Sequence, residues 1–287
     1  MSDDEHMTTT PGTEDQFDRP VRIGFSVWIG LAAVAVYIAL AAGVANLFTD
    51  AIPTSSDAAE FALGHFTVLP VLIVAGVMFI RWAGWSRQVW RTSGAGETQP
   101  RRWWMLAIPV LLLVHIATIF AQVPWGDRSG TLIVVVLAGT AMVGFGEELY
   151  FRGILRATIR AHHGEFVTLL VTSLLFGLAH SLSSLLAGLL PTFVAFQVAA
   201  TALDGAVLYG VFRATGRLWA AILLHGLNDA ALYLVSADTT NPAATAFNPG
   251  SWFAITPTLL WALTAALVIS CLREDLHARA SRKHLTR

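Results

Sequence analysis

Long apolar runs separated by short polar segments make up most of the chain after about residue 23. A membrane-spanning helix needs roughly 20 mostly apolar residues, and about eight runs of that length occur. Their approximate bounds are Gly24–Phe48, Phe66–Trp85, Trp103–Ala121, Thr131–Phe151, Phe166–Leu186, Thr192–Phe212, Leu218–Val235 and Phe253–Leu272. The fourth run can continue to about Arg160, because no Gly-Pro break interrupts it. The pattern predicts an all-α, polytopic bundle of about eight transmembrane helices.

Composition supports this fold class. Of the 287 residues 55% are hydrophobic and 13% are charged, whereas a soluble domain has roughly 25% charged residues. The net charge of -1 provides no basic surface, so we expect no nucleic-acid partner. The single cysteine, Cys271, excludes an internal disulfide and a cysteine metal cluster, and we interpret it as a small apolar filler.

The cationic residues predict the topology. With loops assigned alternately to the two sides, 17 of the 18 Lys and Arg residues fall on one side, and only Arg128 on the other. The positive-inside rule then places both termini in the cytoplasm of a multi-pass cell-membrane protein, with the lipid bilayer as a partner. Residues 1–22 read as a disordered acidic tail without the basic start of a signal peptide, 23–273 as the bundle, and 274–287 as a basic tail.

Ionisable residues inside the predicted spans are the candidates for function, since such groups are costly in a membrane. The fourth span carries Glu147, Glu148 and Arg152, the fifth His180, the sixth Asp204, and the seventh His225, Asn228 and Asp229. At about 1.5 Å per residue, Glu147, His180 and His225 reach similar depths on three helices. Convergence of this kind can build a site in a bundle core.

Spacing separates the roles of the two adjacent glutamates. Glu148 and Arg152 are four residues apart and share a helix face, which predicts an internal ion pair. Glu147 points about 100° away and has no basic partner at helical spacing, so it is the candidate general base. The alternative is a carboxylic acid satisfied by a backbone carbonyl.

The seventh span presents His225, Asn228 and Asp229 at helical spacing. Such groups could hold a substrate carbonyl and stabilise its oxyanion, or they could join helices as polar contacts. Asp204 precedes Gly205 and could either serve the site or make a local hydrogen bond there, and we favour the structural role.

At these residues the sequence resembles the CPBP family of intramembrane proteases, also called the Abi or CAAX-protease family, which includes the type II CAAX prenyl endopeptidase. The family pattern is Glu-Glu-x-x-x-Arg, then Phe-x-x-x-His, then His-x-x-x-Asn or Asp. It is matched by Glu147, Glu148 and Arg152, by Phe176 and His180, and by His225 and Asp229. The resemblance covers about Thr131–Tyr233 and defines a catalytic core at about 131–235.

The resemblance implies an intramembrane endopeptidase that acts on a membrane-associated protein or peptide, not necessarily a prenylated one. Glu147 and His180 would hold a water, and Glu147 would take its proton and later deliver one to the amine. His225 and Asp229 would bind the carbonyl oxygen. Asp229 stands where many members have Asn, and an ionised Asp cannot donate, so it must be protonated or must orient His225. Asn228 could supply an amide instead.

The cofactor and the function class each have an alternative. Glu147, His180 and His225 would be a plausible zinc set, and the family is often described as metalloproteases. However, there is no His-Glu-x-x-His helix, so we favour a glutamate-type enzyme without a cofactor. A transporter with a proton relay would show an internal repeat more clearly. A non-catalytic membrane scaffold or immunity protein would not need the complete motif set.

Overall fold

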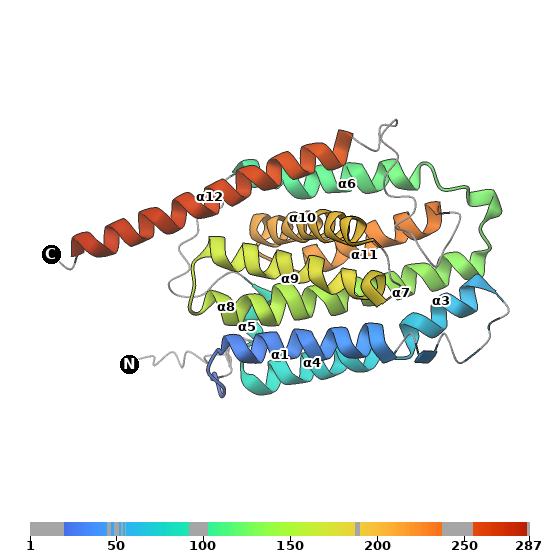
Figure 1. Cartoon of the computed structure of the whole chain (residues 1–287), viewed down its shortest axis with the longest axis horizontal. Helices are drawn as coiled ribbons and strands as arrows, with labels where there is room; N and C mark the ends of the chain where they lie inside the picture. The colour runs from blue at the N-terminus through green and yellow to red at the C-terminus, as the bar shows by residue number, and fades with distance from the viewer. Residues whose placement is uncertain are drawn as a thin grey trace, which may run out of the picture.

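A computed structural model describes residues 20–44, 47–48, 52, 54, 56–91, 103–186, 190–236 and 255–285, without the side chains of 182–186 and 282–285. The described residues form a helix bundle in which the only bridge pairs Arg91 with Arg217 (Figure 1). The elements are α1 (Val27–Ile38), η1 (Ala39–Val44), α3 (Asp57–Phe66), α4 (Leu69–Ala83), α5 (Ser86–Trp90), η2 (Trp103–Leu106), α6 (Ala107–Phe120), η3 (Trp125–Asp127), α7 (Gly130–Glu148), η4 (Leu149–Leu155), α8 (Arg156–Arg160), α9 (Glu165–Leu186), α10 (Pro191–Thr215), α11 (Leu218–Val235) and α12 (Ile255–Leu285).

Seven stretches of the described chain are long and apolar enough to cross a membrane. They are Val27–Val44, Asp57–Ala83, Trp103–Phe120, Gly130–Arg160, Pro191–Thr215, Leu218–Val235 and Ile255–Ser281. The remaining predicted span corresponds to α9 (Glu165–Leu186), whose apolar stretch Glu165–Ser181 is the part described with side chains. The all-α polytopic fold class is therefore confirmed, with seven candidate membrane spans among the described residues.

The second predicted span starts too late. We predict Phe66–Trp85, but the helical region begins at Asp57, where the Ser56 side chain accepts a hydrogen bond from the amide of Ala59 at 3.3 Å. Polar residues in α3 lower the hydropathy of this extension, so the apolar pattern does not include it in the predicted span. The region turns at Thr67 and Val68, and α4 begins at Leu69. Pro70 then lies in the first turn of α4, where proline is tolerated, and not inside one long helix.

The fourth predicted span does run on to Arg160, as the sequence suggested. It passes from α7 through a seven-residue π-helix, η4, into α8 without a break in the chain. A π-helix widens the turn, and such segments occur frequently at functional sites. Arg156, the first residue of α8, donates from Nε to the carbonyl oxygen of Arg152 in the π-helix at 2.7 Å.

Tight crossing of α7 and α11 determines how the site is assembled. An added Cβ at Gly144 would lie 2.7 Å from the backbone nitrogen of Gly226 and 2.8 Å from the carbonyl oxygen of Ile222. The two backbones can therefore approach only because Gly144 lacks a side chain, which is a common device in membrane bundles. This contact brings the end of α7 beside the middle of α11.

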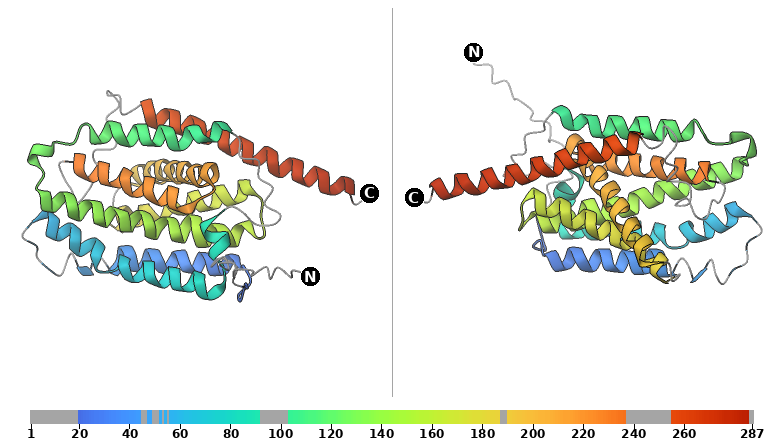
Figure 2. Two further views of the ribbon diagram at one scale, coloured as in Figure 1. Left: turned by 180° about the vertical axis from the view of Figure 1, so that it is seen from behind. Right: turned by 45° about the horizontal axis from the view of Figure 1, so that its top comes forward.

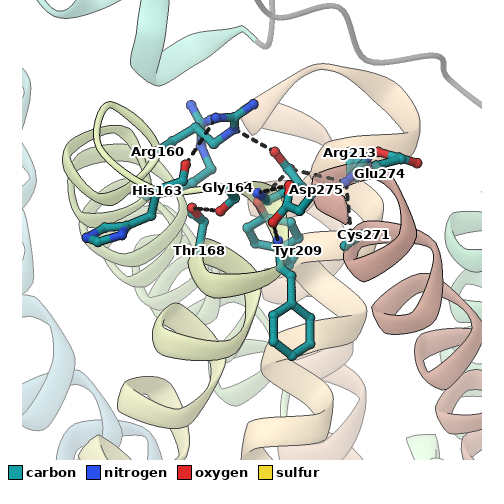
Figure 3. Close-up of polar contacts among 12 residues, drawn as sticks. Arg160, His163, Gly164, Thr168, Tyr209, Arg213, Cys271, Glu274 and Asp275 are labelled. Atoms are coloured by element: carbon teal, nitrogen blue, oxygen red, sulfur yellow. Dashed lines mark hydrogen bonds and ion pairs between the residues drawn. The ribbon is translucent and has the colours of Figure 1, made fainter. Parts of the chain in front are cut away.

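A polar network joins α9, α10 and α12 at the end of the bundle where α8 turns into α9 (Figure 3). Asp275 accepts hydrogen bonds from the first backbone amides of α9, those of Glu165 and Phe166, at 3.0 Å each. Arg213 contacts Glu165 at 3.4 Å and pairs with Glu274. Its Nη1 also donates to the buried Cys271 sulfur at 2.9 Å.

This network lies at the predicted boundary between bundle and tail, residue 274. The helix α12 continues to Leu285 and projects beyond the other helices (Figure 2). Glu274 and Asp275 are structural partners of α9 and α10, so the bundle includes them. Residues 1–19 of the predicted acidic tail lie outside the described residues. The loop 239–250 and the last two residues lie outside them as well.

Contacts between the described basic residues are consistent with the predicted sidedness. The backbones of Arg91 and Arg217 form a β-bridge, and the Arg156 side chain donates to the carbonyl oxygen of Gln88. These cations therefore lie together at one end of the bundle. Arg128 instead donates to the carbonyl oxygens of Leu234 (2.9 Å) and Ser236, at the opposite end of α11. One end of the bundle is thus cation-rich, and Arg128 lies at the other.

Reporter fusions test the orientation that this distribution predicts. Fusions within Ser86–Gln99 and after Arg279 should report from the cytoplasm, whereas fusions within residues 51–56 and 239–250 should report from outside. Paired reporters that are active on opposite sides provide the control at each point. A cytoplasmic signal from 239–250 would contradict the orientation.

Candidate active site

Side chains from α7, α9 and α11 converge at the site that the sequence predicts. The Oε2 atom of Glu147 lies 3.6 Å from Nε2 of His180 and 3.8 Å from Nε2 of His225. The Oδ2 atom of Asp229 lies 3.4 Å from the same nitrogen of His225. The structure therefore brings together all four residues that the sequence singled out for catalysis.

Hydrogen bonds at Nδ1 orient both imidazole rings. The Nδ1 atom of His180 lies 2.9 Å from the carbonyl oxygen of Phe176, which can only accept, so this nitrogen carries the proton. The Nδ1 atom of His225 lies 3.0 Å from Oε1 of Glu148 and donates to that carboxylate. As a result both rings turn Nε2 toward Glu147.

Glu148 does more than the sequence predicts. The expected ion pair is present, with Nη1 of Arg152 at 2.9 Å from Oε1 of Glu148 and both side chains fully buried. The same oxygen accepts the hydrogen bond from His225, which the spacing within one helix could not reveal. Arg152 also donates to the carbonyl oxygen of Gly205 at 2.7 Å. Glu148 and Arg152 thus tie α7 and η4 to both α10 and α11.

The ring of Phe176 occupies the space between these groups. Its centroid lies 4.5 Å from that of His180 and 5.8 Å from that of His225. The guanidinium carbon of Arg152 lies 4.1 Å from the same centroid, within the range of a cation–π contact. Phe176 therefore separates the buried Glu148–Arg152 pair from the His180 side of the site.

The remaining intramembrane polar residues have different positions. Asn228 is half-buried on α11, and among the described residues no hydrogen bond joins it to Glu147, His180 or His225. Asp204 does not bond beside Gly205 as predicted. Its Oδ1 instead accepts from Nε1 of Trp261 at 3.4 Å, which links α10 to α12. The structural role that we favour for Asp204 is thus an interhelical contact.

Exposure shows where the site opens. The side chain of His180 is 36% exposed, whereas those of Glu147 and His225 are 16% and 7% exposed. The Oε2 atom of Glu147 is nevertheless buried and has no hydrogen-bond partner among the described residues. Its distances to the two Nε2 atoms are too long for direct hydrogen bonds. A water molecule that lies to one side of the line between the atoms can bridge such distances. That the site forms a cavity reachable from the cytoplasm stays a prediction.

The donor chemistry here is of the kind that zinc accepts, namely two imidazole nitrogens and a carboxylate. As placed, however, no group of three His, Cys, Asp or Glu side chains in the described ranges is arranged to hold a metal ion. Glu147 would have to move with both rings to complete such a set. We therefore derive no step of the reaction through zinc.

Helices without a recognisable motif also reach this site. Asp229 lies within electrostatic range of Tyr37 on α1 and of His65 on α3. It is also within range of Tyr233, one turn further along α11. The sequence analysis missed all three. His65 was assigned to a loop because α3 was not recognised. A histidine and two tyrosines inside apolar helices were the only signal available for them.

Comparison with known proteins gives one match. Residues 129–231 match the family described as type II CAAX prenyl endopeptidase Rce1-like. No curated protein and no solved structure matches the chain. The matched segment begins next to α7 and ends within α11, so it contains Glu147, His180, His225 and Asp229.

Proposed function

We propose, because residues 129–231 match the type II CAAX prenyl endopeptidase Rce1-like family, that this chain hydrolyses peptide bonds with Glu147 as the general base. At the level of the family, the protein is a CAAX-type intramembrane endopeptidase with many apolar helices. The proposal adds the residues, their roles and the substrate class, which is a membrane-associated protein or peptide.

One observation carries the assignment. A buried carboxylate oxygen without a partner faces two imidazole nitrogens at 3.6 and 3.8 Å. The His180 ring donates from its other nitrogen, so its Nε2 atom and the Glu147 oxygen are both acceptors. A water molecule supplies the missing donors, since it can give one proton to Glu147 and the other to His180. Such a water is positioned and activated for attack.

In the proposed reaction, Glu147 in its ionised form takes a proton from this water while the oxygen attacks the peptide carbonyl carbon. The carbonyl π electrons move to oxygen and form a tetrahedral oxyanion. The carbon–nitrogen bond then breaks, and the proton held by Glu147 passes to the leaving nitrogen. The products are a carboxylic acid and an amine, so no atom or electron is left unaccounted for.

His225 is the proposed oxyanion donor. In its doubly protonated form it donates from Nδ1 to Glu148 and from Nε2 to the oxyanion. The carboxylates of Glu148 at 3.0 Å and Asp229 at 3.4 Å favour that positive charge. Asp229 thereby acts through His225, which removes the difficulty that an ionised Asp cannot donate.

A reconstituted cleavage assay tests this function against the transporter and scaffold alternatives. Purified protein in detergent is incubated with a farnesylated CAAX peptide or with an unprenylated membrane-spanning peptide, and the products are identified by mass spectrometry. Cleavage of either peptide at one internal bond supports an endopeptidase. Intact peptides after incubation with folded protein would overturn the proposal.

We expect cleavage to survive removal of divalent metal ions. The proposed chemistry uses only the Glu147 carboxylate and two imidazoles, so dialysis against a strong zinc chelator should leave the rate nearly unchanged. Inhibition of a zinc protease by the same chelator under the same conditions is the control. Loss of activity that added zinc restores would show that the enzyme is a metalloprotease.

A further inference from the structure

Tyr37 on α1 lies against Gly146, the residue before the proposed catalytic glutamate, although α1 is outside the matched family segment. Its side chain is buried, and its ring stacks on that of Tyr150 with centroids 4.6 Å apart. A Cβ added at Gly146 would lie only 2.8 Å from the Tyr37 hydroxyl oxygen. The absence of a side chain at Gly146 thus lets this hydroxyl reach the backbone next to Glu147.

The two stacked tyrosines use their hydroxyl groups differently. Tyr150 donates to the carbonyl oxygen of Leu72 at 2.9 Å, so its hydroxyl fastens η4 to α4. For the Tyr37 hydroxyl, no hydrogen bond is found within the described part of the chain. This oxygen is not among the fully enclosed polar atoms that lack a partner, so a water or a substrate group can reach it.

Charge and position together indicate which group that water connects. The carboxylates of Glu147, Glu148 and Asp229 lie within electrostatic range of the Tyr37 phenol. Glu147 follows Gly146 in the chain, and its Oε2 atom is buried without a hydrogen-bond partner. The other groups near the Glu147 carboxylate are the Nε2 atoms of His180 and His225, at 3.6 and 3.8 Å, which is too far for direct hydrogen bonds. Glu147 therefore lacks a fixed donor on α9 and α11, and the Tyr37 hydroxyl is a donor on its remaining side.

We propose that Tyr37 is a positioning residue, whose hydroxyl donates through one bridging water to the Glu147 carboxylate and holds it facing His180 and His225. This inference rests on the proposed function of Glu147. It extends the catalytic unit beyond α7, α9 and α11 to α1. The hydroxyl acts before and during proton transfer, not on substrate binding.

The matched variants are Tyr37→Phe and Tyr150→Phe, each of which removes one hydroxyl and keeps the stacked rings. In Tyr37→Phe, kcat should fall about 10-fold with KM and thermal stability nearly unchanged, because an orienting hydrogen bond to the general base is lost. In Tyr150→Phe, the melting temperature should fall, because Leu72 loses its donor, while kcat stays near that of the wild type.

Gly146→Ala provides a second, independent test. Its methyl group forces the Tyr37 hydroxyl away from α7, so it should also lower kcat. In the Tyr37→Phe background the hydroxyl is gone and only the ring carbons remain close, at 3.1 and 3.3 Å from the added methyl, so Gly146→Ala should then cost less in kcat. The two losses are therefore expected to be non-additive.

The outcomes separate this inference from the function on which it rests. If the wild type cleaves, Glu147→Gln does not, and Tyr37→Phe keeps wild-type kcat, the function stands and the role of Tyr37 is wrong. Equal effects of Tyr37→Phe and Tyr150→Phe on stability and kcat would also overturn it, because both hydroxyls would then be structural. A wild type without cleavage would remove the function and this inference together.

Discussion

Replacing Glu147 by Gln is expected to lower turnover by about 10²–10⁴-fold while the protein stays folded. The amide keeps the size of the side chain and can stay buried without a charge partner, but it cannot take a proton from water. Rates of peptide cleavage and thermal-shift curves in detergent, measured on the same preparations, check both parts of this expectation.

Asp204→Asn is the matched control for that variant. It also neutralises an intramembrane carboxylate, and its amide oxygen can still accept from Trp261. Most of the activity should remain, because Asp204 has no part in the proposed reaction. A Glu147→Gln enzyme as active as this control would exclude Glu147 as the general base.

Replacing Glu148 by Gln is expected to act first on stability. The change leaves Arg152 as an unpaired charge in a fully buried position, and breaking a buried pair costs about 3–5 kcal/mol. It also weakens the acceptor for His225, which lies 3.0 Å away, so the surviving folded protein should cleave more slowly. Thermal shift and specific activity should both decline, in contrast to Glu147→Gln. Equal melting temperatures for the two single variants would contradict this division of roles.

The double variant Glu148→Gln with Arg152→Met tests whether the unpaired charge causes the instability. Removing the guanidinium should recover part of the lost stability. Recovery will be incomplete, because the carbonyl oxygen of Gly205 then loses the donor that lies 2.7 Å away. A double variant less stable than Glu148→Gln alone would show that Arg152 stabilises the bundle mainly through α10.

Features set by local spacing could be predicted from the sequence. The Glu148–Arg152 pair follows from a four-residue separation on one helix, and most spans follow from the length of apolar runs. The convergence of Glu147, His180 and His225 was predictable in outline, since polar groups inside a membrane must find one another.

Features set by contacts between distant segments could not be predicted. The hydrogen bond from His225 to Glu148 depends on the close approach of α7 and α11 at Gly144, which no spacing along one helix encodes. The capping of α9 by Asp275 from α12 is of the same kind. The start of α3 was missed for a different reason, because polar residues at a helix end resemble a loop in a hydropathy pattern.

Cleavage in isotopic water tests the central claim most directly. Purified wild-type protein and the Glu147→Gln variant are incubated with a membrane peptide in ¹⁸O-enriched water, and the products are weighed by mass spectrometry. Hydrolysis through a Glu147-activated water predicts a single internal cut with ¹⁸O in the new carboxyl group, and no product from the variant. Intact peptide with the wild type, or labelled product formed equally fast by Glu147→Gln, would contradict it.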